Sequence, residues 1–395
     1  MNNKLRDVVF SGIVKVRDKL LAAKDPIRLE SGEPSFDTPQ HIKDAMAKAL
    51  QDNHTHYAPS TGIKPLREAI LEKVARENGI DYLNGIGDIC VTNGGMHAIY
   101  CALHTILNPG DEILMQNPNW TATEWISLLS GATIKYVRLR PDLEYRWDMD
   151  ELAKAVTDKT KVIFINTPHN PTGGVFTKDD MEKILDIAEK HDLYIVSDEA
   201  YEHIIYDEKH YSIAGVAKNR SATLRNKIIT CFTFSKSYAM TGWRVGYTVS
   251  TGKEFNENMA KMILYSINGV STPSQYAAVA ALNGPQENVS RMRDIYKQRR
   301  DLLFEGINST EYLTCEFLPK GAFYLYCGIT PAWSGTEWDL ANYLIDTYSM
   351  GSVPGEIFYD TEPAIRFSYA CDTETIERAI ATLKQSKQTG KKVTA

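Results

Sequence analysis

Between about residues 85 and 250, short β-rich runs alternate with amphipathic helical stretches, and this alternation limits the folds open to the chain. Alternating strands and helices are typical of a mostly parallel sheet with helices on both faces. We therefore predict an α/β fold. One of the helical stretches, TKDDMEKILDIAEKHD, opens with Thr177 and Asp180 in capping-box spacing. Another is GMHAIYCALHTIL, and the predicted strands are DICVT, DEILMQ, ATIKYV, KVIFIN, LYIVSD and KIITCFTF.

The two ends of the chain have a different pattern. A long charged helix is expected over 285–307, followed by a strand-like segment, a helix over 336–348, the strand AIRFSYA and a final helix over 373–387. This order predicts a smaller α+β domain, and a polar, frayed tail after Gln385. We expect three parts: an N-terminal segment (1–45) that joins the smaller domain, a large domain (46–285) and a small C-terminal domain (286–395).

Composition excludes several classes of protein. The 395 residues are 43% apolar and carry a net charge of −6, so no strong global field attracts nucleic acid or an anionic membrane. The N-terminus lacks the apolar region of a signal peptide, and no run approaches the ~18 apolar residues of a membrane span. The six cysteines form no CxxC pair, which favours buried reduced thiols. We expect a cytoplasmic protein without a metal site.

The segment TFSKSYAMTGWRVGY, residues 233–247, has the residues that a lysine needs to form an imine with a phosphorylated aldehyde. Lys236 lies between Thr233 and Ser235 on one side and another serine on the other, and Arg244 follows between two glycines. Hydroxyl groups and an arginine can bind the phosphate, and glycines let the backbone come close.

Two further segments follow predicted strands, at the edge where open α/β sheets bind ligands. Asn170 projects from the Pro- and Gly-rich loop NTPHNPTGGVF, which alone is as well explained by a simple turn. Asp198 lies near the start of SDEAYEHIIYD and, being poorly solvated, needs a cation such as a pyridinium N–H, with Tyr201 close by. A helix N-cap is the simpler alternative for Asp198. The adjacent Glu199 and Glu202 are expected to be solvated helix residues.

Other candidates are weaker alone. The N–H groups of Gly95 and Met96, after a Gly-Gly turn, form a helix N-terminus that can bind phosphate. Trp120 can stack on a planar ring or be an ordinary core aromatic, and Tyr57 lies in a loop before a helix. Arg366, in the strand-like AIRFSYA, needs a carboxylate from substrate or from a structural salt bridge.

In chain order the residues that define these segments are GEP, Y-AP-G, GG, NP-W, N-PTG, DE-Y, SK, R-G and R-S. This series resembles the class I/II pyridoxal-phosphate aminotransferases, which share the aspartate aminotransferase fold, from Gly32 to about residue 385. SGEPSFDTP and SKSYAMTGWRVGY are most similar to the prokaryotic branch that includes aspartate and aromatic aminotransferases.

The resemblance implies a role for each residue. Lys236 is implied to form the Schiff base with pyridoxal phosphate and then to act as the proton-transfer base, while Asp198 keeps the ring nitrogen protonated. Tyr201 and Asn170 are implied to bond the ring O3′, and Trp120 to stack on the ring. The implied phosphate ligands are Gly95, Met96, Thr233, Ser235, Arg244 and, from a neighbouring subunit, Tyr57; those of the substrate carboxylate are Arg366, Gly32 and Asn170.

The function implied is ping-pong transfer of an amino group from an L-amino acid to a 2-oxo acid, with 2-oxoglutarate as the expected acceptor, by a homodimer with shared active sites. A lyase of the cysteine-conjugate type would use the same cofactor and lysine, and a non-catalytic binding protein is a third reading. Met96 stands where the aspartate branch often has lysine, so the donor stays open between aspartate and an aromatic or other neutral amino acid.

Overall fold

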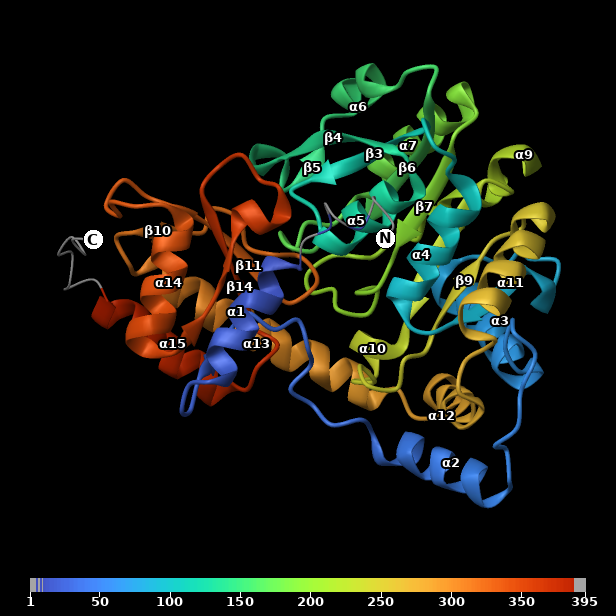
Figure 1. Ribbon diagram of the computed structural model, residues 1–395, viewed down its shortest axis with the longest axis horizontal. Helices are drawn as coiled ribbons and strands as arrows, with labels where there is room; N and C mark the ends of the chain where they lie inside the picture. Colours follow the sequence, from blue (N-terminus) through green and yellow to red (C-terminus); the bar gives the residue numbers. More distant parts are fainter. Residues whose placement is uncertain (1–4, 6–7, 9, 387–395) are drawn as a thin grey trace.

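An eight-stranded sheet forms the centre of the larger part of the molecule in a computed structural model, which describes residues 5, 8 and 10–386 (Figure 1). Five neighbouring strands, β8-β7-β6-β3-β4, are parallel, whereas β9 runs antiparallel to β2 and β8, and β5 antiparallel to β4. The predicted α/β fold is therefore confirmed. In spatial order the strands are β2 (Ile89–Thr92), β9 (Gly246–Val249), β8 (Ile228–Thr233), β7 (Tyr194–Asp198), β6 (Thr160–Asn166), β3 (Glu112–Asn117), β4 (Thr133–Arg140) and β5 (Arg146–Trp147).

Helices cover both faces of this sheet, because its central strands are apolar on both sides. In β6, Val162 and Phe164 belong to a core that includes α4, α5 and α11, whereas Ile163 and Ile165 belong to a second core on the other face. The first group of helices is α4 (Gly95–Ile106), α5 (Thr121–Ser130) and α11 (Lys253–Ile267); the second core includes α2 (Gln40–Gln51), α3 (Lys64–Asn78), α6 (Met149–Ala155), α7 (Lys178–His191), α8 (Ile213–Val216), α9 (Ala222–Arg225) and α12 (Thr272–Asn283).

The expected capping box is present at the start of α7. The Thr177 hydroxyl accepts a hydrogen bond from the Asp180 N–H at 3.2 Å, and the Asp180 carboxylate accepts one from the Thr177 N–H at 2.8 Å. Two N–H groups that the helix itself leaves without acceptors are thereby satisfied.

A second, smaller sheet lies beside the first and is antiparallel, in the order β10-β11-β14-β13 (Figure 1). Its core combines β11 and β14 with three helices, as the pattern of the C-terminal part predicts. The polar tail lies outside the described residues beyond Ser386. The elements are α13 (Glu287–Asn308), β10 (Leu313–Thr314), β11 (Tyr324–Ile329), α14 (Glu337–Tyr348), β12 (Met350–Gly351), β13 (Val353–Pro354), β14 (Ala364–Ser368) and α15 (Thr373–Ser386).

The N-terminal segment contacts both parts. β1 (Ile27–Arg28) pairs with β12, and α1 (Gly12–Leu21) packs Val16 and Leu20 against α14. Further along, α2 packs against α12, which belongs to the larger part. The division into 1–45, 46–285 and 286–395 remains our proposal, with α2 as the helix at which the chain passes from the smaller to the larger part.

Neither a membrane span nor a disulfide is found in the part of the chain that the structure describes. None of its helices is both long and apolar enough to cross a bilayer. All six cysteines are free thiols, and five of them are buried, Cys371 being the half-buried one.

Candidate active site

A cavity of about 280 Å³ lies at the carboxyl ends of β6, β7 and β8, and the predicted site residues other than Tyr57 line it. Asn166, Asp198 and Thr233 are the last residues of these three strands. Because neighbouring parallel strands end at the same edge, their last residues meet even though they are far apart in sequence. The predicted residues gathered here are Gly32, Gly95, Met96, Trp120, Asn170, Asp198, Tyr201, Thr233, Ser235, Lys236, Arg244 and Arg366.

Lys236 enters the cavity from α10 (Phe234–Ser237), a single turn of helix that follows β8 directly. Its Nζ donates a hydrogen bond to the carbonyl oxygen of Gly32 at 2.6 Å. Burial lowers the pKa of Lys236 to about 8. A side chain at Gly32 would place its Cβ 2.3 Å from the Tyr324 hydroxyl, so only glycine fits here. The lysine amine is therefore both fixed in position and easily deprotonated.

Asp198 has a buried carboxylate, and the described chain offers few partners to stabilise its negative charge. Its Oδ1 accepts a hydrogen bond from the Ala200 N–H at 3.2 Å, and no lysine or arginine of the described chain forms a salt bridge with it. Burial, with a contribution from Glu199, raises the pKa of Asp198 to about 7. A protonated ring nitrogen would supply the missing positive charge, which is the requirement that the sequence predicts.

Tyr201 and Asn170 are oriented by neighbours in the cavity wall. The hydroxyls of Tyr201 and Tyr324 share a hydrogen bond at 2.9 Å. The side-chain oxygen of Asn170 accepts a bond from Arg366 at 3.0 Å, and its backbone N–H donates to Asn166 at 2.8 Å. Since the Asn170 oxygen is occupied, its side-chain N–H groups are left to donate toward a ligand.

Arg366 is 1% exposed and lies between the rings of Tyr324 and Phe358, with its guanidinium carbon 4.4 and 4.9 Å from the ring centres. Its Nη2 donates to the carbonyl oxygen of Glu30 at 2.7 Å, while its buried Nε has no hydrogen-bond partner. No carboxylate of the described chain forms a salt bridge with Arg366. The structural salt bridge considered above is thus not observed, and a substrate carboxylate would satisfy this buried charge.

Another part of the cavity lining is suited to a phosphate. Gly95 begins the twelve-residue helix α4, whose first N–H groups lack acceptors within the helix. The Arg244 guanidinium packs against Gly94, where an added Cβ would lie 2.7 Å from Nη2. The Thr233 and Ser235 hydroxyls are 3.0 Å apart beside it. Helix N–H groups, two hydroxyls and an arginine form a donor set for a phosphate dianion, so the residues present fit pyridoxal phosphate.

Apolar side chains form another part of the wall: Ile13 from α1, Met96 and Ile99 from α4, and Trp120. Met96 is 48% exposed. The charged residues of the lining are Asp198, Lys236, Arg244 and Arg366, each of which already has a place in the arrangement above. The described lining therefore holds no further cation for a second substrate carboxylate.

Tyr57 does not join this cavity. Its side chain is 93% exposed and lines a separate surface hollow with residues of the loop before α12. A role in the active site therefore requires that it reach another subunit.

The expectation that Glu199 and Glu202 are solvated helix residues is wrong. Residues 199–203 form a turn, and both side chains are buried. Glu199 accepts hydrogen bonds from Ser197 and Ser212, both at 3.0 Å, and its other oxygen is 2.9 Å from His210 Nε2. The acidic pattern gave no sign of these partners, because only the fold brings His210 and Ser212 back to the end of β7.

The cavity also contains residues that sequence reasoning missed: Ile13, Ile99, Asn166, Ala200 and Tyr324. Asn166 and Ala200 adjoin predicted motifs and could have been found by following each strand end by a residue or two. Tyr324 lies in the apolar run FYLYC, where nothing distinguishes it from a core aromatic.

Comparisons with known proteins agree with this geometry. The family model "Aminotransferase class I and II" matches residues 24–383. The probable aspartate aminotransferase of Methanocaldococcus jannaschii is 38% identical over 92% of this chain and 94% of its own length. Aromatic-amino-acid aminotransferase 2 of Thermococcus litoralis is 37% identical over 96% of each chain. A solved Thermus thermophilus aspartate aminotransferase variant complexed with tryptophan superposes with a TM-score of 0.91, at 33% identity, over 98% of this chain and 99% of its own.

Proposed function

The chain belongs to the class I and II aminotransferases, which use pyridoxal phosphate, and we propose that it moves the amino group of an L-amino acid to a 2-oxo acid. One observation carries the proposal: among the described residues, a buried lysine, a buried aspartate without a salt bridge to a cation and a buried arginine without a salt bridge to a carboxylate line the same cavity. Amino transfer needs these three groups: the lysine as the base, the aspartate as the partner of the ring nitrogen, and the arginine to bind the substrate carboxylate.

Pyridoxal phosphate, when bound, supplies an aldehyde that joins the substrate nitrogen and a ring that accepts electrons from the substrate Cα–H bond. Asp198 would hold a proton on the ring nitrogen of the bound cofactor, which would keep the ring electron-poor. Tyr201 and Asn170 would donate hydrogen bonds to the ring oxygen, and Trp120 would pack against the ring.

Lys236 moves the proton. Because burial lowers its pKa to about 8, a useful fraction of the amine is neutral near pH 7 and able to accept a proton from the substrate Cα. The protonated Lys236 nitrogen would then be the donor that returns this proton once the cofactor is bound. The hydrogen bond from Nζ to the Gly32 carbonyl supports this role, because it holds the amine within the cavity.

Arg366 binds the substrate α-carboxylate, with Asn170 and the Gly32 N–H beside it. The guanidinium is already oriented by the Glu30 carbonyl and the Asn170 oxygen, so little ordering is required when the carboxylate binds. Gly95, Met96, Thr233, Ser235 and Arg244 hold the phosphate.

We further propose an aromatic or other neutral donor over aspartate. Ile13, Met96 and Ile99 offer an apolar surface to the entering side chain, and the described lining has no unassigned cation. The acceptor, 2-oxoglutarate, is retained as a proposal from the family resemblance alone.

The proposed assembly is a cytoplasmic homodimer in which Tyr57 binds the phosphate of the neighbouring subunit. Exposed aromatic side chains support such an interface, since Tyr57 and Tyr265 are 93% and 86% exposed. Tyr57 lines the surface hollow described above, and Tyr265 lies just before Ile267, which also lines it.

The experiment is a panel of amino donors (Asp, Glu, Ala, Phe, Tyr, Met, Leu, Lys) with 2-oxoglutarate, run on the wild type and on Lys236→Ala. We expect glutamate to form with wild type, fastest with neutral or aromatic donors, and no turnover with the variant. Sustained release of ammonia and pyruvate without an oxo acid would replace the proposal by the lyase reaction. Equal activity of the two proteins would overturn the assignment of Lys236.

A further inference from the structure

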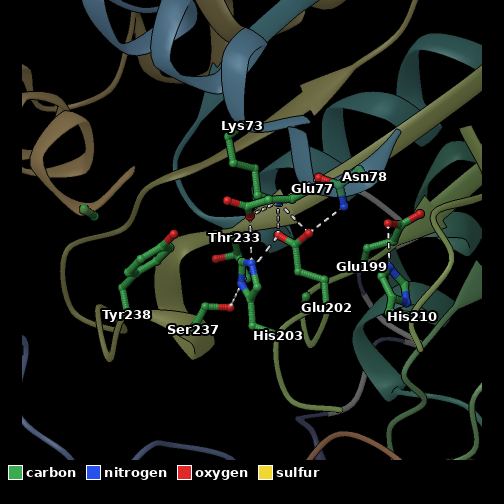
Figure 2. Close-up of polar contacts among 12 residues, drawn as sticks. Lys73, Glu77, Asn78, Glu199, Glu202, His203, His210, Thr233, Ser237 and Tyr238 are labelled. Atoms are coloured by element: carbon green, nitrogen blue, oxygen red, sulfur yellow. Dashed lines mark hydrogen bonds and ion pairs between the residues drawn. The ribbon is translucent and has the colours of Figure 1, made fainter. Parts of the chain in front are cut away.

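A partly buried polar network joins the two segments that carry the principal residues of the active site (Figure 2). We name it the brace and define it as Lys73 and Glu77 of α3, Glu202 and His203 of the turn after β7, and Ser237 of α10. None of the five lines the cavity. The sequence gave no hint of it, since Glu202 was expected to be solvated.

The centre of the brace is an ion pair. Lys73 is 1% exposed, and its Nζ is 2.5 Å from each carboxylate oxygen of Glu202. Asn78 accepts a bond from Lys73 at 2.9 Å and donates one to Glu202 at 2.7 Å. Burial alone would raise the pKa of Glu202, but the charge of Lys73 lowers it below its usual value. A buried ion pair with these additional hydrogen bonds fixes the relative position of the two segments that carry it, because neither charge has an equally close partner elsewhere in the described chain.

Lys73 also contacts the strand that leads to the catalytic lysine. Its Nζ lies 4.7 Å from the ring centre of Phe232 in β8. The ion pair therefore joins α3 to the turn after β7 and contacts β8 (Figure 2).

His203 extends the brace to α10. Its Nε2 is 3.0 Å from a Glu77 oxygen, and its Nδ1 is 2.9 Å from the Ser237 hydroxyl. Because the Glu77 carboxylate only accepts, Nε2 carries the proton of that bond. Although burial alone would raise the pKa of Glu77, the bond from His203 and the charge of Lys73 lower it to about 2, so Glu77 stays ionised.

Two residues of the brace directly follow active-site residues in the sequence. Ser237 follows Lys236, and Glu202 follows Tyr201 in the turn after Asp198. α10 has only four residues, so few hydrogen bonds of its own hold its orientation. The Ser237–His203 bond is a direct side-chain link between the lysine turn and the aspartate–tyrosine turn.

We propose that His203 and Glu202 are positioning residues of the aminotransferase: through Ser237 and Lys73 they hold the Lys236 turn at a fixed distance from Asp198 and Tyr201. The inference rests on the proposed function, because it takes Lys236 as the residue joined to the cofactor. It assigns no bond to substrate for any residue of the brace.

The test uses the full-length protein in four forms: Ser237→Ala, His203→Phe, the double variant, and His203→Gln, which can still hydrogen-bond on both sides. Two control variants match them in burial without touching the cavity. Ser130→Ala removes a buried hydroxyl bonded to the Ser127 carbonyl, and Arg146→Met removes a side chain 23% exposed, as against 22% for His203. Three quantities are measured: the cofactor Kd of the apoprotein, the pH midpoint of the bound cofactor's visible absorbance, and Tm.

We expect Ser237→Ala and His203→Phe to weaken cofactor binding by about two- to tenfold, the effect of one lost hydrogen bond, and to move the absorbance midpoint by about half a pH unit. The double variant should equal His203→Phe, because both changes remove the same link. His203→Gln should restore most of the wild-type midpoint. The two control variants should lower Tm and leave the cofactor Kd and the absorbance midpoint unchanged.

The proposal is overturned if Ser237→Ala and His203→Phe lower Tm as the controls do and leave both cofactor readouts unchanged, or if their effects simply add. Failure of the proposed function looks different, since a wild-type protein that binds no cofactor through Lys236 would show no such absorbance in any form.

Discussion

Asp198→Asn is expected to stabilise the apoprotein while weakening cofactor binding. The carboxylate is buried and forms no salt bridge with a cation of the described residues, and its pKa is about 7 in the folded protein against an ordinary value of 3.8. The difference of about three pH units corresponds to roughly 4 kcal/mol of destabilisation once the group is ionised in both states. Asparagine has the same shape and no charge, so it removes this penalty.

The size of the stabilisation expected from Asp198→Asn depends on pH. Between about pH 4 and 7 the folded state binds more protons at Asp198 than the unfolded chain does, so the stability of the wild-type apoprotein falls as pH rises through this window. The gain from Asp198→Asn should be about 3 kcal/mol larger at pH 8 than at pH 5. For 395 residues the full effect at pH 8 corresponds to a rise in Tm of about 5 °C.

The assay is thermal and denaturant unfolding of both apoproteins at pH 5 and pH 8, with cofactor affinity measured separately. Loss of the charged bond to the ring nitrogen should raise the cofactor Kd by about 10- to 150-fold, or roughly 1.5–3 kcal/mol. Asp180→Asn is the control, because that buried aspartate has Arg146 as a partner at 2.9 Å and its loss should destabilise at both pH values. An apoprotein that Asp198→Asn destabilises at pH 8 would refute the reasoning.

Three other predictions follow from the cavity. Arg366→Lys keeps the charge but loses the two-pronged contact, so kcat/KM for every donor should fall by about 10- to 150-fold, and a change confined to one donor would contradict the carboxylate role. In the apoprotein, the labelling rate of Lys236 by an amine-reactive reagent, followed by peptide mass spectrometry, should rise with pH and level off above about pH 8; a rise that continues toward pH 10 would contradict the burial effect. Met96→Lys, at a half-exposed position, should raise the ratio of kcat/KM for aspartate to that for phenylalanine about two- to fivefold, and an unchanged ratio would remove Met96 from the side-chain subsite.

Much of the fold and most of the site follow from local patterns. The six predicted strands are found because each is an apolar run long enough to be recognised, and Asp198 and Asn170 were found because they come just after such runs. β9 and β5 were not among them; β5 has two residues, which are too few to show a period.

Contacts between distant segments could not be predicted. Glu202 pairs with Lys73, which lies 129 positions away in the sequence. The residues around a glutamate in an acidic turn do not indicate such a partner. Tyr324 has the same difficulty: its hydroxyl meets Tyr201 only because β11 of the smaller part lies against the larger. Local sequence identifies residues that carry chemistry, whereas tertiary packing decides which residues orient them.

The central claim is that Lys236 carries out amino transfer on pyridoxal phosphate in this cavity. The most direct measurement mixes the holoenzyme with a neutral amino donor and no oxo acid, and counts the 2-oxo acid formed per bound cofactor. The account predicts one oxo acid per site, with the cofactor left in its aminated form, and none with Lys236→Ala. Many turnovers per site with release of ammonia, or an unchanged yield from Lys236→Ala, would contradict it.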